Sequence, residues 1–223
     1  MHALAIYDLD KTITHAPTWT AFIIASARAQ KPWRLALLPL AGVATLGYAL
    51  KLVDRARLKQ ITQRLLLGNG WQDARVARAV ADFADGVIAT GVYTGARAAI
   101  AADRAAGRRI VLATASYAFY AGAIAERLGF DDVIGTCIVR DNGNVRARIE
   151  GENCYGAAKL RMIDAWMAGE GIARDDATIR FYSDHVSDAP TLEWADEAFA
   201  VNAHGPLRLL AKLKGWTVVD FER

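Results

Sequence analysis

Four acidic side chains come in two close pairs, one near the start of the chain and the other near its end. The pairs are Asp8 with Asp10 and Asp184 with Asp188. Four carboxylates in one crevice repel each other, which is tolerable only if a hard cation and a basic side chain offset their charge. Mg²⁺ accepts one or two carboxylates, keeps several waters and binds phosphate oxygens. If the fold joins the two pairs, the sequence predicts a Mg²⁺ site with Lys159 beside it.

Each acidic pair follows a predicted strand. Residues 3–7 form a short apolar run of the kind found in buried parallel strands. A second buried strand is expected at 109–114, where Thr114 ends it, and a further strand at 178–183. Helical segments separate them, as a doubly wound sheet requires. Ligands bind to such sheets outside the carboxyl ends of the strands. We therefore expect an α/β fold with a mostly parallel, Rossmann-like sheet whose carboxyl edge collects these polar residues.

The long stretch between the first and second runs lacks a strand pattern. Ala, Leu, Arg and Gln recur there in helical rhythm, over residues 19–30, 33–53, 54–67 and 72–89. We expect residues 13–93 to form an all-helical segment that is inserted into a core made of residues 1–12 and 94–223.

The second half of the chain continues the alternation. The pattern predicts a helix at 117–128 with Ser116 as its N-cap, and a hairpin that turns at Asn142 and Gly143. Helices near 156–169 and 188–195 and a strand at 197–201 follow, before a last helix and strand.

Composition narrows the class of protein. Hydrophobic residues make up 53% of the 223 residues, which supplies a core and excludes intrinsic disorder. The 27 Lys and Arg exceed the 24 Asp and Glu only slightly, and we expect the excess to be spread along the chain, so no nucleic-acid partner is predicted. Two isolated cysteines, Cys137 and Cys154, and a start at Met1 without a signal peptide favour a cytoplasmic location.

Residues 35–53 are apolar except for Lys51 and approach the length of a membrane span. A single span would separate Asp8 from Asp184, although the chemistry needs them in one site. A helix buried within the helical subdomain is the favoured interpretation. A helix that lies on a membrane surface, giving the protein a peripheral contact with lipid, is the alternative.

Four short motifs resemble, in order, those of haloacid dehalogenase superfamily phosphatases. They are LAIYDLDKTIT, IVLATAS, the lysine of NCYGAAKL, and FYSDHVSDAP. The helical stretch between the first two resembles the cap of the phosphoserine phosphatase-like branch, the subfamily IB hydrolases. The resemblance covers nearly the whole chain, and four motifs at compatible spacings are more specific than the first alone.

The resemblance implies different catalytic roles for Asp8 and Asp10. Asp8 would attack phosphorus and form an aspartyl-phosphate, and Asp10 would be the general acid and then the general base. Residues i and i+2 of an extended segment point the same way, which suits these roles. The Asp8 and Asp184 carboxylates and the Asp10 backbone carbonyl would hold Mg²⁺.

The resemblance also implies a cradle for the phosphate oxygens, where phosphoryl transfer draws most of its acceleration. It would comprise the Thr114 hydroxyl, the Lys159 ammonium and the backbone N–H groups of Leu9, Asp10 and Ala115. Asp188 would orient Lys159 or a metal-bound water, and Thr12 would shape the loop after Asp8.

Several assignments have simpler alternatives. Asp188 could serve only as a helix N-cap, and Lys159 could be a solvated helix residue, with Arg161 as the true cation. His15 and His185 lie next to motifs and could face either the cleft or the surface.

The start of the predicted cap departs from the pattern of phosphoserine phosphatases, which carry a Glu for the substrate amine about nine residues after the nucleophile. Pro17 and Thr18 occupy that neighbourhood here, so a cationic amine would lack its counter-charge. Arg55 or Arg57 could instead bind an anionic substrate group. We therefore expect a small or lipid-like phosphomonoester, such as phosphatidylglycerophosphate, as substrate. The alternatives are phosphoserine, or a catalytically silent regulatory protein that binds a phospholigand.

Overall fold

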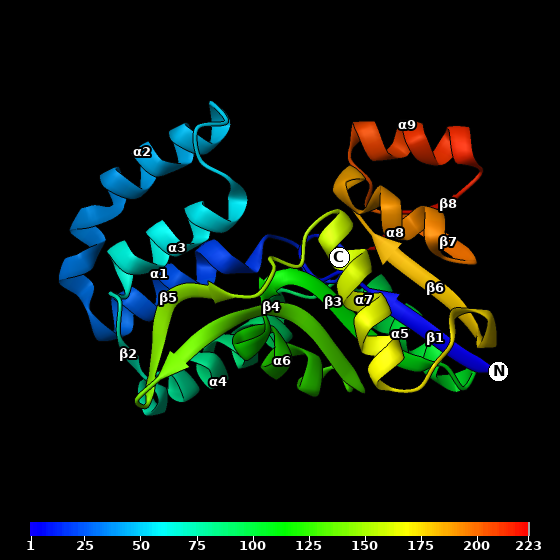
Figure 1. The fold of residues 1–223 in the computed structure, drawn as a ribbon, viewed down its shortest axis with the longest axis horizontal. Helices are drawn as coiled ribbons and strands as arrows, with labels where there is room; N and C mark the ends of the chain where they lie inside the picture. Colours follow the sequence, from blue (N-terminus) through cyan, green and yellow to red (C-terminus); the bar gives the residue numbers. More distant parts are fainter. Residues whose placement is uncertain (223) are drawn as a thin grey trace.

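The computed structural model describes residues 1–222, which form one sheet of eight strands in the order β2-β5-β4-β3-β1-β6-β7-β8 (Figure 1). Its parallel part consists of β4 Asp132–Asp141, β3 Arg109–Tyr117, β1 His2–Tyr7, β6 Ala177–Ser183, β7 Glu197–Val201 and β8 Thr217–Val219. The predicted α/β fold with a mostly parallel sheet is confirmed.

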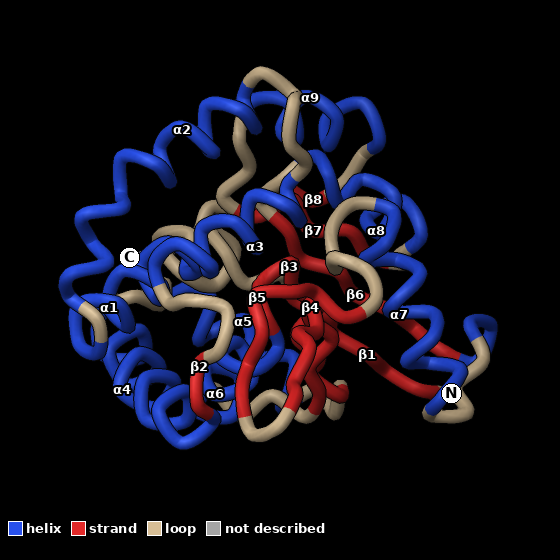
Figure 2. Tube along the Cα trace, turned by 60° about the vertical axis from the view of Figure 1, so that its left-hand side comes forward, coloured by secondary structure: helices blue, strands red, loops and turns tan. Residues whose placement is uncertain are grey.

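Helices cover both faces of this sheet. Successive residues of a strand point to opposite faces, so Leu4 and Ile6 of β1 join one buried cluster and Ala5 and Tyr7 join another. One face is covered by α5 Thr94–Ala105 and α6 Ala118–Arg127, and the other by α7 Ala157–Gly169, α8 Ala189–Trp194 and α9 Gly205–Lys214 (Figure 2).

The strand register brings the two acidic pairs to the same edge. Tyr7, the last residue of β1, pairs with Tyr182 of β6 and with Leu112 of β3. The backbone N–H of Asp8 then donates a hydrogen bond to the carbonyl of Tyr182 at 2.9 Å. Asp8 and Asp184 therefore leave neighbouring strands at nearly the same level.

The segment between β1 and β3 is helical apart from one short strand. Its helices are α1 Thr18–Gln30, the 3-10 helix η1 Pro32–Leu37, α2 Leu38–Ala49, α3 Arg55–Leu66 and α4 Asp73–Thr90. The expectation of an all-helical segment missed β2 Trp71–Gln72, which pairs antiparallel with β5 Asn144–Glu150. The β4–β5 hairpin offers β2 a free edge, a partner more than 70 residues away that local periodicity does not report.

The hairpin turns at Asn142 and Gly143, as predicted, and both have positive φ. The end of β3 differs from the prediction. The strand runs to Tyr117 through an irregularity after Thr114, so Tyr117, and not Ser116, occupies the N-cap position of α6. Ser116 is thereby left facing the carboxyl edge of the sheet.

The apolar segment 35–53 also differs from the prediction. It divides between η1 and α2, and Ala41 is the only residue of α2 that is buried. The favoured interpretation, a buried helix, is therefore wrong for most of this segment. No helix within residues 1–222 is both long and apolar enough to cross a membrane.

Candidate active site

Lys159 joins the two acidic pairs. Its Nζ donates to Asp8 Oδ1 at 2.8 Å and to Asp188 Oδ2 at 2.5 Å. Burial opposes the ammonium form, but the carboxylates of Asp188 and Asp8 outweigh it and raise the pKa of Lys159. Lys159 is 1% exposed, so the ion pairs are screened little by water. The Ser183 hydroxyl donates to Asp188 at 2.8 Å and fixes this carboxylate in place.

Asp8 and Asp184 line one cavity of about 190 Å³ together with Asp10, Lys159, His185 and Asp188; we call it the acidic cavity. Burial outweighs the opposing charge of Lys159 and raises the pKa of Asp8 to about 6, and the charges of Asp188 and Asp10 add to the rise. Burial and the charges of Asp8 and Asp188 raise the pKa of Asp184 to about 7. The protein thus holds two carboxylates in close, unfavourable proximity.

This arrangement suits Mg²⁺. Within residues 1–222 no three His, Cys, Asp or Glu side chains are grouped so that they alone could hold a metal ion. Mg²⁺ does not need such a cage, because it binds one or two carboxylates and completes its shell with waters and substrate oxygens. A divalent cation between Asp8 and Asp184 would also offset the burial and the repulsion that raise their pKa values.

Asp10 is held by groups from two distant parts of the chain. Its Oδ1 accepts hydrogen bonds from the Thr18 backbone N–H and the Thr18 hydroxyl, each at 2.7 Å. Its Oδ2 accepts from the Ser116 hydroxyl at 3.0 Å, and Tyr120 donates in turn to Ser116 at 2.7 Å. Three donors therefore fix the Asp10 carboxylate in one orientation.

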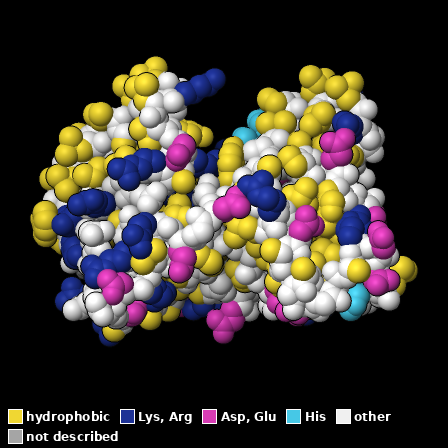
Figure 3. All heavy atoms as spheres, in the orientation of Figure 1, with side chains coloured by type: hydrophobic (Ala, Val, Ile, Leu, Met, Phe, Trp, Pro, Cys, Tyr) yellow, Lys and Arg dark blue, Asp and Glu magenta, His cyan; other side chains and the backbone are white. Residues whose placement is uncertain are grey.

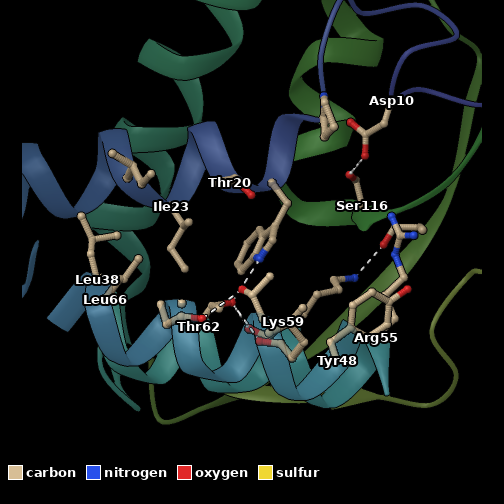
Figure 4. Close-up of a pocket in the computed structure, with 18 residues that line it drawn as sticks. Asp10, Thr20, Ile23, Leu38, Tyr48, Arg55, Lys59, Thr62, Leu66 and Ser116 are labelled. Carbon is tan, nitrogen blue, oxygen red and sulfur yellow. Dashed lines mark hydrogen bonds between the residues drawn. The ribbon is translucent and has the colours of Figure 1, made fainter. Parts of the chain in front are cut away.

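A second and larger cavity, of about 450 Å³, opens beside Asp10 between α1, α2 and α3 (Figure 4). Most of its wall is apolar, so we call it the apolar chamber. Its lining includes Trp19, Ile23, Leu38, Ala41, Leu58 and Leu66. Asp10, Pro17, Arg55 and Ala115 line both cavities. Asp10 therefore stands between a polar space that can hold a phosphoryl group and an apolar space that can hold the rest of a substrate.

Lys59 of α3 reaches from the chamber wall to the end of β3. Its Nζ donates to the Ala115 carbonyl at 2.6 Å and to Asn153 Oδ1 at 3.0 Å, and it lies 4.1 Å from the centre of the Tyr117 ring. Burial is the main reason that the pKa of Lys59 falls to about 7. The contact ties the α3 helix to the end of β3, which carries Ala115.

The haloacid dehalogenase-like hydrolase family matches residues 5–193 of this chain. The chain belongs to this family. The match spans both acidic pairs and Lys159, so the predicted membership of this superfamily is confirmed.

The hydrolase has similar proteins in bacteria. It is 30% identical over 226 residues to a probable phosphatase of Mycobacterium tuberculosis strain H37Rv, an alignment that covers 98% of this chain and 75% of the relative. A solved structure from Bordetella pertussis, described as a protein with unknown function, has a TM-score of 0.88 at 27% identity and 99% coverage of both chains. A substrate-bound phosphoserine phosphatase shares the fold, with a TM-score of 0.64 at 16% identity and coverage of 99% of this chain and 93% of that one.

Most site residues expected of this hydrolase come together at the carboxyl edge. Around the acidic cavity the structure gathers Asp8, Asp10, Ala115, Lys159, Asp184, His185, Asp188 and Arg55. The Thr12 hydroxyl lies 3.5 Å from Asp8 Oδ2, and Leu9 is buried in the intervening loop. Asp188 occupies the N-cap position of α8 without a capping hydrogen bond from its side chain, so the simple capping alternative does not account for it.

Other residues lie away from the two cavities. Arg161 pairs with Glu152 on the surface, so it does not replace Lys159. Arg57 is exposed, and His15 packs edge-on against Tyr93 with the ring centres 4.5 Å apart. The Thr114 hydroxyl is buried and accepts from the Ser116 backbone N–H at 3.0 Å, which leaves its phosphate contact a prediction.

Sequence reasoning missed Thr18, Ser116 and Lys59 as site residues. Thr18 is the first residue of α1, directly after Pro17, and such a position presents a free N–H to an anion. Lys59 shares a helix face with Gln63 and Leu66, both buried. A lysine on the apolar side of an amphipathic helix was the available sign of a buried partner.

Proposed function

We propose that this hydrolase is a Mg²⁺-dependent phosphomonoesterase that acts through Asp8. The observation that carries the proposal is the position of the Asp8 carboxylate, held by Lys159 at 2.8 Å in a cavity that also contains Asp184 and adjoins Asp10. An ion-paired carboxylate that lines a space able to hold a phosphoryl group is suited to nucleophilic attack. The names of the relatives, phosphatase among them, support the same reaction class.

In the first step a carboxylate oxygen of Asp8 forms a bond to phosphorus while the bond from phosphorus to the leaving oxygen breaks. Asp10 gives its proton to that leaving oxygen. In the second step a water oxygen attacks phosphorus, its proton passes to Asp10, and the bond to Asp8 breaks. Phosphate leaves, Asp8 is a carboxylate again, and Asp10 is again the protonated acid with which the cycle began.

The remaining residues bind the phosphoryl oxygens, position Lys159 or bind Mg²⁺. Lys159 and the backbone N–H groups of Leu9, Asp10 and Ala115, with the Thr114 hydroxyl, would bind the phosphoryl oxygens. Asp188 positions Lys159. When bound by the Asp8 and Asp184 carboxylates and the Asp10 carbonyl, Mg²⁺ would neutralise part of the negative charge of nucleophile and substrate. The two unpaired cysteines support a cytoplasmic setting for this reaction.

The substrate we propose is a phosphomonoester whose leaving group is largely apolar, small or lipid-like. The apolar chamber adjoins the proposed general acid, which is where a leaving group must lie. Phosphoserine is the alternative, as the fold neighbours suggest. Asp10 is the only acid among the chamber's lining residues, so the substrate's ammonium group would have no counter-charge apart from the general acid.

Hydrolysis of p-nitrophenyl phosphate by the purified full chain tests the reaction class. We expect activity with Mg²⁺ that is lost with EDTA and lost in Asp8→Asn. A panel of phosphoserine, sugar phosphates, histidinol phosphate and lipid phosphates then identifies the leaving group. Binding of Mg²⁺ and phosphate without turnover of any substrate would favour the silent, phospholigand-binding alternative.

A further inference from the structure

The α2 helix is apolar on both of its sides, although it lies at the surface. Leu38, Ala41 and Tyr48 line the apolar chamber. On the opposite side Leu40, Val43, Leu46 and Leu50 follow each other at spacings of three and four residues and are 54%, 66%, 59% and 61% exposed. A helix that is apolar all round is normally covered on all sides. This one is covered on its inner side only.

The exposed apolar surface continues beyond this helix. Trp33 of η1 is 65% exposed, and Leu52 after α2 is 78% exposed. We call Trp33, Leu40, Val43, Leu46, Leu50 and Leu52 the docking face. Figure 3 shows hydrophobic side chains gathered over the arm that holds α2 in Figure 1. Large exposed apolar patches of this kind mark surfaces that bind another protein or a membrane.

The charge around the docking face is strongly positive. Residues 28–64 contain eight Lys or Arg and a single acid, Asp54, so the positive excess is concentrated in this segment and the expectation that it is spread along the chain was wrong. Within residues 1–222 none of these eight has an acidic ion-pair partner. Those exposed are Arg28, Lys51, Arg57 and Arg64. Figure 3 shows Lys and Arg side chains beside the apolar ones on this arm.

We propose that the docking face lies on an anionic lipid bilayer. Two contributions hold an interfacial helix on a membrane. Its apolar side chains enter the boundary of the acyl chains, and its cations lie against anionic headgroups. Trp33 is the residue type enriched at that depth. A protein partner would require acids placed to match these cations, whereas the headgroups of an anionic bilayer supply negative charge throughout their layer.

Docking would also place the apolar chamber next to the lipid, because α2 forms one wall of the chamber with its inner side. A phosphomonoester with an acyl chain could then pass from the bilayer toward Asp10 along that wall. This last step rests on the proposed function, whereas the docking itself does not.

Flotation of the full chain with vesicles tests the proposal. One set is phosphatidylcholine alone, and the other is equal parts phosphatidylcholine and phosphatidylglycerol. We expect binding to the anionic vesicles that is at least tenfold stronger than to the neutral ones and that weakens with added salt. Leu46→Glu and Val43→Glu should each reduce binding at least tenfold. Leu213→Glu on α9 is the matched control, because Leu213 is 76% exposed and lies outside the docking face, and it should bind like the unaltered chain.

Two further measurements separate this proposal from others. Asp8→Asn should still bind vesicles, and Leu46→Glu should still hydrolyse p-nitrophenyl phosphate, so docking and catalysis fail independently. No binding to anionic vesicles, or equal loss in Leu213→Glu and Leu46→Glu, would overturn the proposal. So would a dimer in light scattering that Leu46→Glu dissociates while vesicle binding is absent, since a second copy would then cover the docking face.

Discussion

Thr18 donates two hydrogen bonds to one oxygen of Asp10, from its backbone N–H and from its hydroxyl, each at 2.7 Å. Thr18 begins α1, the first helix after the loop that follows Asp8. The proposed general acid is therefore oriented by the same segment that forms the apolar chamber. A substrate that shifts α1 would also shift Asp10.

Loss of the Thr18 hydroxyl should slow catalysis. Thr18→Val keeps the shape and the backbone donor but removes one bond to a charged acceptor, an interaction of about 1.5–3 kcal/mol. We expect kcat for p-nitrophenyl phosphate to fall about 10- to 100-fold, with a smaller change in KM and a displaced pH profile. Thr90→Val, at an exposed threonine of α4, is the control and should leave kcat unchanged. An unaltered pH profile in Thr18→Val would show that the hydroxyl does not position Asp10.

Removal of Lys159 should harm both stability and activity. Lys159→Met leaves the Asp8 and Asp188 carboxylates buried without their cation, which costs about 3–5 kcal/mol of unfolding free energy. Adding Asp188→Asn removes one of the two charges, so urea denaturation should show part of that stability restored while hydrolysis stays absent. Full activity in Lys159→Met would contradict its assignment to the phosphate site.

Stabilisation by Mg²⁺ should grow with pH. The pKa values of Asp8, about 6, and Asp184, about 7, exceed those of the unfolded chain, so between about pH 4 and about pH 7 the folded state binds more protons. Stability without metal therefore falls over this window as pH rises. Mg²⁺ binds only the deprotonated carboxylates, so its effect on Tm should be small near pH 5 and large near pH 8.

Thermal unfolding with EDTA and with Mg²⁺ measures this difference. Asp184→Asn should remove most of the Mg²⁺-dependent rise in Tm, and Asp175→Asn, on the exposed turn before β6, should keep it. A rise of equal size at both pH values would show that these carboxylates do not bind the ion.

Catalytic efficiency should increase with the length of an apolar leaving group. Each buried methylene contributes about 0.8 kcal/mol, so kcat/KM should rise about fourfold per carbon along a series of alkyl phosphates until the chamber is full. Leu58→Glu places a charge in the chamber wall and should flatten this series while p-nitrophenyl phosphate is still hydrolysed. No dependence on chain length in the unaltered chain would contradict an apolar leaving group.

The sequence predicted the position of site residues that directly follow a recognisable strand. Asp8 and Asp184 each come directly after a strand that could be predicted, so their place at one edge of a parallel sheet could be predicted too. The contacts that orient Asp10 could not, because Ser116 lies 106 residues away and reaches the site only through an irregularity in β3. Local propensity favoured Ser116 as a helix cap instead.

The apolar segment 35–53 is a case in which the sequence pattern predicted the wrong environment. Its composition predicts burial, but α2 has no polar side to indicate which face meets the protein, so periodicity could not show that its outer side is exposed. Whether the outer side of α2 is exposed depends on whether other parts of the fold pack against it.

The most direct test of the account is the identity of the phosphorylated residue during turnover. The full chain with Mg²⁺ and p-nitrophenyl phosphate is quenched in acid, and peptide mass spectrometry locates the added phosphoryl group. We predict one phosphoryl group on Asp8. A phosphoryl group on another residue, or hydrolysis by Asp8→Asn at the rate of the unaltered chain, would contradict the account.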